Sequence, residues 1–392
     1  MAQDQFLHGI EIVQIDDGAR PIQTVRSSVI GVIGTAPDAD PAAFPLNTPT
    51  LIAGSRLEAT KLDTTGEGNG TLPAALVDIF DQIGAMVVVI RVAEGGAPEE
   101  TKANVIGGVD IATGKYTGVQ AFLSAESVAK VAPKILIAPG FTHDAAVVNA
   151  MLPIANRLRA MIYVDGPNTN DTEAITYRET FSSKRIYLFD PWVKVFDTIA
   201  KTDVVRPASA RFAGLRARVD NERGWWWSLS NNTLNGVVDT ARTVEFTMGD
   251  PNSRANLLNE KQVTTVIAQD GFLAWGNRTC SSDQKWAFEQ TVRTADMIEE
   301  SIWRAHLWAV DRNITKTYVA DVTDGVNAYL RYLTGIGGIL GGTCWADPAA
   351  NPSDQIKQGK IAFDFDFSSN YPAEHIIFRS HLVDTYIQEI FA

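Results

Sequence analysis

The first half of the chain alternates short apolar runs with segments in which apolar residues recur at helical spacing. The runs are rich in β-branched residues and lie at 28–34, 50–53, 86–92, 135–140, 161–167 and 185–196. Helical spacing follows at 74–84, 145–159 and 173–181. Continuous apolar runs are typical of strands that are buried on both faces. Strands that alternate with helices predict a mainly parallel sheet with helices on both sides, which is a three-layer α/β unit.

Beyond residue 200 the helical pattern dominates, so the chain is α+β overall. Helices are predicted at 208–219 and 322–333, and a helix followed by a short strand at 257–274. The longest helical pattern, at 282–313, has apolar positions that predict a core-facing stripe: Trp286, Val292, Ile298, Ile302, Trp303 and Leu307. We interpret the triplet Trp225–Trp227 as buried between domains or subunits, with stacking on bases or sugars as the alternative.

Both ends of the chain carry strand patterns that lack an obvious local partner. Residues 6–15 (FLHGIEIVQI) predict a strand, but Pro21 breaks pairing with the adjacent downstream segment. Near the other end, 361–367 (IAFDFDF) and the segment from 374 onward predict a hairpin over 361–383. Unmet backbone groups favour strand addition to another sheet, either within one chain or between chains. Pairing between chains would make head-to-tail contacts, which build rings or helical filaments.

Composition narrows the class of protein. The chain has 392 residues, which exceeds what one core usually serves, so two or more units are expected. Its net charge is −12, which disfavours general binding to nucleic acid. The N-terminus has no signal-peptide pattern, and the longest apolar run, 85–90, is too short to span a bilayer. Cys280 and Cys344 are far apart and outside any CxxC motif, so we interpret them as reduced thiols.

Two glycine-rich loops raise the possibility of nucleotide binding. Residues 66–70 precede a helix, whose N-terminus could attract an anion, but no Lys-Ser or Lys-Thr pair comes after them. Residues 108–115 (GVDIATGK) have five residues between the glycines instead of four, and Tyr116 replaces the Ser or Thr of a P-loop. The glycines of 335–342 come after a helix, which predicts a helix cap and a close approach to another backbone. Ordinary loops are therefore the preferred interpretation.

No arrangement of residues predicts catalysis. The five histidines show no metal-ligand spacing: His8, His143, His306, His375 and His381. The chain has no GxSxG motif, and neither cysteine has a catalytic signature around it. We therefore predict no catalytic residue, no metal site and no cofactor.

Several motifs in order along the chain resemble those of contractile tail sheath proteins. Residues 258–279 (LNEKQVTTVIAQDGFLAWGNRT), followed by 286–302 (WAFEQTVRTADMIEESI), resemble the family's characteristic stretch, with one arginine where it often has two. Upstream, AALVDIFDQIG with VVVIRV (87–92), PGF (139–141) and YVDGP (163–167) fit its α/β domain. Downstream, GGILGG (337–342) and IAFDFDF match its inner domain. The resemblance covers nearly the whole chain.

The resemblance implies an organisation in four parts. Residues 1–25 would be an N-terminal arm and linker, 26–255 an outer α/β domain, 256–383 an inner domain with a tube-facing helix and a C-terminal hairpin, and 384–392 a C-terminal arm. Sheath subunits stack as hexameric rings in a helical tube, where both arms join the inner-domain hairpins of neighbouring subunits. The implied partners are other copies of the chain, the tail tube protein, and baseplate and tail terminator proteins, with no direct contact to nucleic acid and no membrane insertion.

Individual residues take roles from this resemblance. The arm strands would include Leu7, Ile10, Ile12, Val13, Ile15, Tyr386, Ile387 and Ile390. The receiving hairpin would include Phe363, Phe365, Phe367, Ile376, Phe378 and Leu382. Asp16, Gly18 and Pro21 are the expected hinge, and Arg331 is the expected contact with the tube.

The expected function is a structural subunit of a contractile sheath, located in a virion tail and assembled in the cytoplasm of a bacterial host. The sequence does not decide between an infectious phage and a bacteriocin particle. The alternative hypothesis is a cytoplasmic α/β enzyme or a nucleotide-binding protein.

Overall fold

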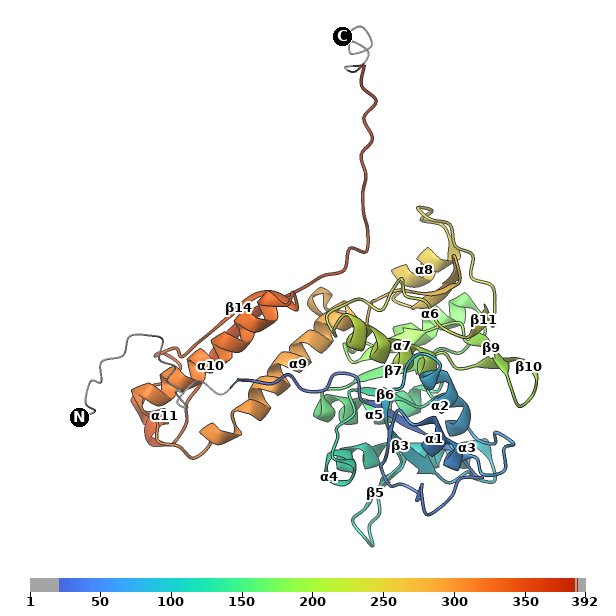
Figure 1. The fold of residues 1–392 in the computed structure, drawn as a ribbon, viewed down its shortest axis with the longest axis horizontal. Helices are drawn as coiled ribbons and strands as arrows, with labels where there is room; N and C mark the ends of the chain where they lie inside the picture. The colour runs from blue at the N-terminus through green and yellow to red at the C-terminus, as the bar shows by residue number, and fades with distance from the viewer. Residues whose placement is uncertain (1–20, 385, 387–392) are drawn as a thin grey trace, which may run out of the picture.

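The computed structural model describes residues 21–384 and 386, and in it a large and a small unit are joined by one long helix (Figure 1). The large unit is built on a six-stranded sheet. Its strands, in spatial order, are β2 (Thr50–Ala53), β3 (Met86–Val92), β1 (Ile30–Thr35), β6 (Ile135–Ile137), β7 (Met161–Asp165) and β8 (Ile186–Phe189).

The sheet is mixed rather than wholly parallel. Strands β3, β1, β6, β7 and β8 run parallel to one another, with Ile30 of β1 opposite Val87 of β3 and Ile135 of β6. The edge strand β2 runs antiparallel to β3. The apolar runs predicted these strands because each parallel strand is buried on both faces.

Helices cover both faces of the sheet, and alternate residues of the strands enter two separate cores. On one face, Val89 and Phe189 pack with α2 (Leu72–Phe80) and α7 (Ser209–Glu222). On the other, Ile90 and Leu188 pack with residues of several helices. These are α3 (Pro98–Ile106), the 3₁₀-helix η2 (Gly118–Ser124), α5 (Ala145–Leu158), α6 (Asp171–Glu179) and α8 (Arg254–Glu260).

Shorter elements complete the large unit. One small antiparallel sheet has three strands, in the order β10 (Thr202–Arg206), β9 (Val193–Asp197) and β11 (Val237–Thr240). A second pairs β12 (Thr265–Ala268) with β13 (Phe272–Trp275). A third pairs β4 (Gly108–Val109) with β5 (Tyr116–Thr117). The remaining short helices are α1 (Arg56–Ala59), η1 (Thr60–Leu62) and α4 (Ala125–Ala129). The single strand expected over 185–196 is two strands, β8 and β9, separated by Pro191, which has no backbone N–H for a ladder.

The segment from α8 to β13 belongs to the large unit, although the sequence predicted that a second domain begins at residue 256. Leu258 and Ile267 enter one core of the large unit, and Val266 and Ala274 enter the other. Their apolar side chains are buried only by packing on the sheet, so the change from one unit to the other falls later, along the long helix.

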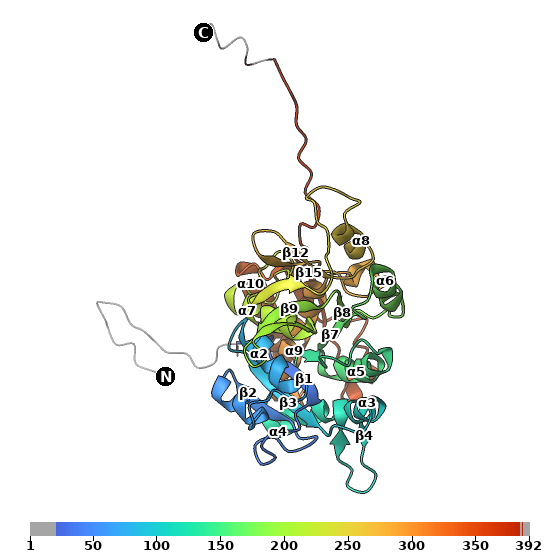
Figure 2. The same ribbon diagram turned by 90° about the vertical axis from the view of Figure 1, so that its right-hand side faces the viewer.

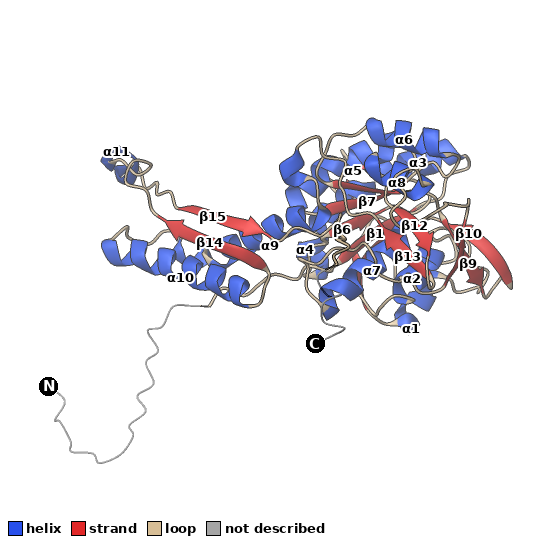
Figure 3. Ribbon diagram, turned by 90° about the horizontal axis from the view of Figure 1, so that it is seen from above, coloured by secondary structure: helices blue, strands red, loops and turns tan. Residues whose placement is uncertain are grey.

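The small unit is elongated and extends away from the large one (Figure 3). It is joined to the large unit by α9 (Glu289–Ala305). Its own elements are α10 (Lys316–Gly335), β14 (Ile339–Trp345), α11 (Ser353–Lys357) and β15 (Asp364–Ser369). The helical pattern predicted over 282–313 is divided into η3 (Gln284–Trp286), α9 and η4 (Leu307–Ala309). The predicted stripe is only partly buried: Ile298 lies in the core, whereas Trp303 and Leu307 are 67% and 78% exposed.

The strand partner of IAFDFDF differs from the one that the sequence predicted. β15 pairs antiparallel with β14, with Phe367 opposite Gly342 and Phe365 opposite Cys344. The expected hairpin of 361–367 with 374–383 is not formed within the chain, since residues 370–384 contain no strand. β14 reaches β15 because α10 ends at Gly335 and the turn at Gly337, with φ of 75°, reverses the chain beside it.

The chain leaves the body of the molecule at its C-terminal end. Figures 1 and 2 show the described residues beyond β15 extending away from both units. The predicted arm residues Leu7, Ile10, Ile12, Val13, Ile15, Ile387 and Ile390 lie outside the described residues.

Candidate functional site

The long helix α9 carries a row of charged side chains that are buried against the large unit. Glu289, Arg293, Asp296 and Glu300 are each at most 4% exposed. They occur at intervals of three or four residues and therefore share one face of the helix. Each has a partner of opposite charge on the large unit.

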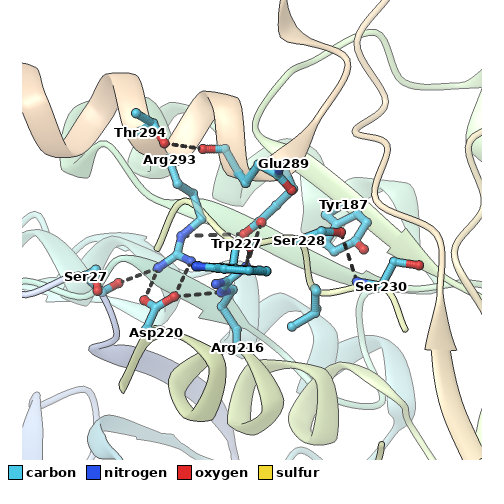
Figure 4. Close-up of polar contacts among 12 residues, drawn as sticks. Ser27, Tyr187, Arg216, Asp220, Trp227, Ser228, Ser230, Glu289, Arg293 and Thr294 are labelled. Carbon is cyan, nitrogen blue, oxygen red and sulfur yellow. Dashed lines mark hydrogen bonds and ion pairs between the residues drawn. The ribbon is translucent and has the colours of Figure 1, made fainter. Parts of the chain in front are cut away.

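The first contact of this row joins α9 to α7 (Figure 4). The guanidinium of Arg293 donates from Nη1 and Nη2 to the two carboxylate oxygens of Asp220, at 2.8 and 2.5 Å. Asp220 also accepts from Nε of Arg216 at 2.8 Å, one turn back along α7. Such a two-pronged pair fixes orientation as well as distance.

Glu289 extends this cluster toward the sheet. Its carboxylate accepts from the hydroxyl of Tyr163, on β7, at 2.8 Å and from Nη1 of Arg216 at 3.3 Å. The first turn of α9 is therefore bonded to both the sheet and α7.

The next turns of α9 cross the amino ends of the parallel strands. Arg185, just before β8, forms a two-pronged pair with Asp296, in which Nη2 lies 2.9 Å from Oδ1. Lys134, just before β6, pairs with Glu300, and Lys134 and Glu300 are each 5% exposed at the side chain. Arg159, just before β7, pairs with Glu299. The helix is thus fixed at several points to residues that precede the amino ends of β6, β7 and β8.

Burial and pairing have opposite effects on these charges. Burial opposes ionisation of Asp220, but Arg293 and Arg216 outweigh it and hold the pKa of its carboxyl at about 2. Burial raises the pKa of Asp296 despite Arg185, and burial lowers the pKa of Lys134 despite Glu300. Removal of one member of such a pair leaves an uncompensated buried charge, which costs about 3–5 kcal/mol. The row therefore makes α9 and the large unit a single rigid body.

The N-terminal linker is bonded to α9 where this helix contacts the large unit. Nη2 of Arg293 donates to the carbonyl of Ser27 at 2.9 Å, and the backbone N–H of Val25 donates to Oγ of Ser301 at 3.1 Å. Farther along, the hydroxyls of Thr24 and Tyr329 lie 3.1 Å apart, which joins the linker to α10. Pro21, the first described residue, is exposed, whereas the predicted hinge residues Asp16 and Gly18 lie outside the described residues.

The second notable feature is the two-stranded sheet of the small unit. In the described part of the chain, β14 and β15 have no other strand beside them, so each has an unpaired edge. Phe363, Phe365 and Phe367 face the core formed with α10, while Asp364 and Asp366 are exposed on the other face. A two-stranded sheet is marginally stable alone, and its open edges can accept further strands.

The third feature is the exposed C-terminal segment. Its root is fixed by a salt bridge from Arg278 to Glu374 and by an edge-on contact between the rings of Tyr371 and Phe288. Beyond the root, Phe378 and Leu382 are 92% and 99% exposed. Ile376, Ile377, Val383 and Tyr386 are also exposed. Apolar side chains gathered in this way mark a surface that another molecule covers.

The predicted tube contact lies on the exposed face of α10. Arg331 is exposed there, and so are Asp321 and Asp324. The face has no excess of positive charge.

The loops that invited a nucleotide hypothesis have structural explanations. In the 66–70 loop, the carboxylate of Asp63 accepts from the backbone N–H groups of Gly66 and Gly68, at 2.9 Å each. The GVDIATGK segment forms the β4–β5 hairpin, in which the Asp110 carboxylate accepts from the N–H groups of the turn. Both loops use their own side chains to satisfy the backbone donors that a phosphate would otherwise bind.

The tryptophan triplet lies where the two units meet. Trp225 packs against the core of the small unit, and Trp226 lies over Gly338, in the turn that precedes β14. Trp227 is 48% exposed, and its carbonyl accepts from Arg216.

Both cysteines are buried free thiols. Burial raises the pKa of Cys280 to about 12 and also raises the pKa of Cys344. Among residues 21–384 and 386, no group of three or more His, Cys, Asp or Glu side chains could hold a metal ion. In the same residues, no helix is both long and apolar enough to cross a membrane.

The charged row of α9 was missed by the sequence analysis, which searched the helix for an apolar stripe. Charged residues recur at positions 289, 293, 296, 300 and 304, which is the spacing of one helical face. Arg304 closes the row by pairing with Glu126 of α4. A charged face is usually solvated, so this signal becomes informative only when the partners at the strand ends are also known.

Comparison with protein families gives a consistent result. The family described as phage tail sheath protein central domain matches residues 114–280, and the family described as phage tail sheath C-terminal domain matches residues 281–382. The boundary between them lies after β13 and before α9.

Individual relatives extend the match over nearly the whole chain. The tail sheath protein of Escherichia phage P2 is 39% identical over 393 aligned residues, with 98% of each chain covered. The major tail sheath protein of Serratia phage KSP20 is 37% identical, with 99% of this chain and 98% of the relative covered. Among solved structures, the helical sheath of the anti-feeding prophage in its contracted state has the same fold, with a TM-score of 0.71 at 21% identity, over 95% of this chain and 98% of that one.

Proposed function

Because the chain belongs to the phage tail sheath protein family and is a subunit of a contractile tail sheath, we propose that it polymerises as stacked hexameric rings around a tail tube. Contraction of these rings would drive the tube through the envelope of a target cell. The family is structural, so an enzyme or a nucleotide-binding protein is no longer the alternative.

The observation that carries this proposal is the combination of an open sheet and an uncovered strand-like segment in one chain. β14 and β15 each have a free edge, and residues 376–383 are extended, exposed and rich in apolar side chains. Within the described residues, the free edges have no further strand paired to them, and the apolar side chains of 376–383 are not covered. Insertion of this segment into the sheet of a neighbouring copy would satisfy both.

This arrangement supports an assignment of the arms. Residues 1–20 are the N-terminal arm, with the hinge at 16–21, because the linker is bonded to α9 and α10 from Thr24 onward. The C-terminal arm begins after Glu374, where the last contact with the large unit lies, rather than at 384. The receiving elements are β14 and β15 with Phe363, Phe365 and Phe367, while Ile376, Phe378 and Leu382 belong to the inserted arm.

Contraction in this scheme moves rigid subunits that remain tied by their arms. The outer domain would comprise residues 26 to about 280, and the inner domain the remainder up to Glu374, with α9 holding the two together. Rotation of the rings would bury more surface between subunits, at about 25 cal/mol per Å² of apolar area. The backbone bonds of an inserted strand, each contributing about 0.5–1.5 kcal/mol, would keep neighbours linked during that movement.

The tube would lie against the exposed face of α10. With Arg331 beside Asp321 and Asp324, this contact would be weak, which suits a tube that must slide free. Baseplate and tail terminator proteins would bind the two ends of the polymer.

Electron microscopy of the purified full-length chain, at increasing concentration, tests this function. We expect hollow cylinders with sixfold end views, and we expect deletion of residues 1–20 to abolish them while the subunit keeps its thermal unfolding midpoint. Cylinders that still form after this deletion would refute the arm assignment. A full-length chain that never polymerises, alone or with a tube protein, would refute the proposed function.

A further inference from the structure

The unpaired edge of β15 has a two-faced pattern. Asp364 and Asp366 point away from the core, whereas Phe363, Phe365 and Phe367 face it. Oδ1 of Asp366 accepts from the backbone N–H of Thr343 at 2.8 Å, and both aspartates are exposed. An added strand must therefore meet acidic groups on one face and aromatic rings on the other.

The C-terminal segment carries the complementary pattern. In an extended chain, Ile376, Phe378 and Leu382 lie on one face. Arg379 and His381 lie on the other face, where Ile377 and Val383 flank them. The interval between Arg379 and His381 is two residues, which equals the interval between Asp364 and Asp366. Placing the apolar face of this segment beside Phe365 and Phe367 places its basic face beside the two aspartates.

The other candidate strand lacks this complementarity. Residues 6–15 contain no Lys or Arg, and their one acidic residue is Glu11. The exposed face of β14 carries Thr343 and Trp345 and no acidic group. Charge thus distinguishes the two edges: the edge of β15 suits the segment 376–383, and the edge of β14 is left for a strand without Lys or Arg.

Geometry excludes pairing of this segment with β15 of its own chain in the described structure, because the segment extends away from the small unit (Figure 2). The segment from Glu374 to Val383 spans about 30 Å when extended, at about 3.3 Å per residue. The acceptor is therefore a second copy whose β15 lies within that distance of the Arg278–Glu374 contact.

We infer that Arg379, supported by His381, pairs with Asp364 or Asp366 of a neighbouring copy and sets the register of the inserted C-terminal strand. This inference rests on the proposed strand exchange between subunits and adds to it which edge receives which arm. A shift by one residue would place Arg379 against the aromatic face and Phe378 in solvent, so the paired charges select one alignment.

The test is charge reversal in the full-length chain, with the critical concentration for polymerisation measured by sedimentation. We expect Arg379→Glu, and separately Asp366→Lys, to raise this concentration by about five- to tenfold, as the loss and reversal of a cross-strand charge pair predict. The double variants Arg379→Glu with Asp366→Lys, and Arg379→Glu with Asp364→Lys, then report the register. The double variant that returns to within about twofold of wild type identifies the aspartate opposite Arg379.

The matched control is Arg157→Glu on α5, which is exposed and belongs to the large unit. We expect it to leave the critical concentration unchanged. Normal polymerisation of Arg379→Glu, or no recovery in either double variant, would overturn the inferred pair while the sheath function remained. A wild-type chain that stays monomeric in every condition would overturn the proposed function and this inference with it.

Discussion

The two units of the molecule differ in how completely their sheets are covered by helices and paired at their edges. In the large unit, helices cover both faces of the six-stranded sheet and two cores fill the space between. In the small unit, as far as residues 21–384 and 386 show, the core has seven buried residues and both edges of the sheet are open. One long helix lies on one face of that sheet. The sheet of the large unit is therefore covered by helices of the same unit, whereas the sheet of the small unit keeps unpaired edges in the described part of the chain.

This difference assigns a separate task to each unit. A unit whose sheet is covered on both faces can move as a rigid body, while a sheet with open edges can accept a further strand and hold it. The charged row of α9 connects the two units, because its ion pairs fix to the large unit the helix that leads into the small one. This difference between the units can be tested with substitutions in three places: where α9 contacts the large unit, within the large unit, and within the small unit.

Breaking the contact between α9 and the large unit should have the largest effect on stability. Arg293→Ala leaves Asp220 and Glu289 buried with Arg216 as their remaining cation, so we expect the free energy of unfolding to fall by about 3–5 kcal/mol. Urea unfolding below the polymerisation concentration measures this loss. The exposed Lys357→Ala serves as the control and should change stability by less than about 0.5 kcal/mol. A loss below about 1 kcal/mol for Arg293→Ala would mean that other contacts hold α9 in place.

The large unit alone should respond to pH through Asp165. This carboxylate, at the end of β7, accepts from the N–H and hydroxyl of Ser209 at 2.7 and 2.6 Å, and burial raises its pKa to about 6. The unfolded chain loses this proton near pH 4, so between pH 4 and 6 the folded chain holds more protons and its stability falls as pH rises. From pH 4.5 to 7.5 this contribution is roughly 2 kcal/mol.

Comparison of wild type with Asp165→Asn isolates that contribution. The amide cannot ionise, so the difference in urea midpoint between the two proteins should change steadily over this pH range. A constant difference would show that Asp165 does not titrate there. Titration of Asp220 does not interfere, because its stabilising charge is lost only as pH falls from about 4 toward 2.

The large unit was also the part that the sequence predicted best. Runs such as MVVVIRV are buried on both faces, so local composition and tertiary environment agree, and the strands fall where the pattern placed them. The sequence predicted a domain change at residue 256, whereas α8 packs on the sheet of the large unit. From its sequence α8 looks like any amphipathic helix, so this packing could not be predicted from it.

Prediction failed where the outcome depends on distant partners. Residues 335–342 were interpreted as a helix cap and a close backbone crossing, and both features are present, but the same glycines also begin β14. Glycine is unfavourable in strands, so no local rule selects that segment as the partner of β15 over 374–383. The charged row of α9 was missed for a related reason, since its partners lie at four separate strand or helix ends.

The smallest expected effect tests the small unit alone, through two adjacent glycines of β14. A Cβ added at Gly342 would lie 2.6 Å from the backbone oxygen of Asp366, whereas a Cβ at Gly341 would meet no atom within 4 Å. Gly342→Ala should therefore separate the two strands at a cost of about 1–3 kcal/mol, and Gly341→Ala should be nearly neutral. Hydrogen exchange distinguishes the units, because amides of β15 should lose protection in Gly342→Ala while those of β1 and β7 keep theirs. Equal loss in both units would show that the molecule unfolds as one body and that the small unit has no separate stability to lose.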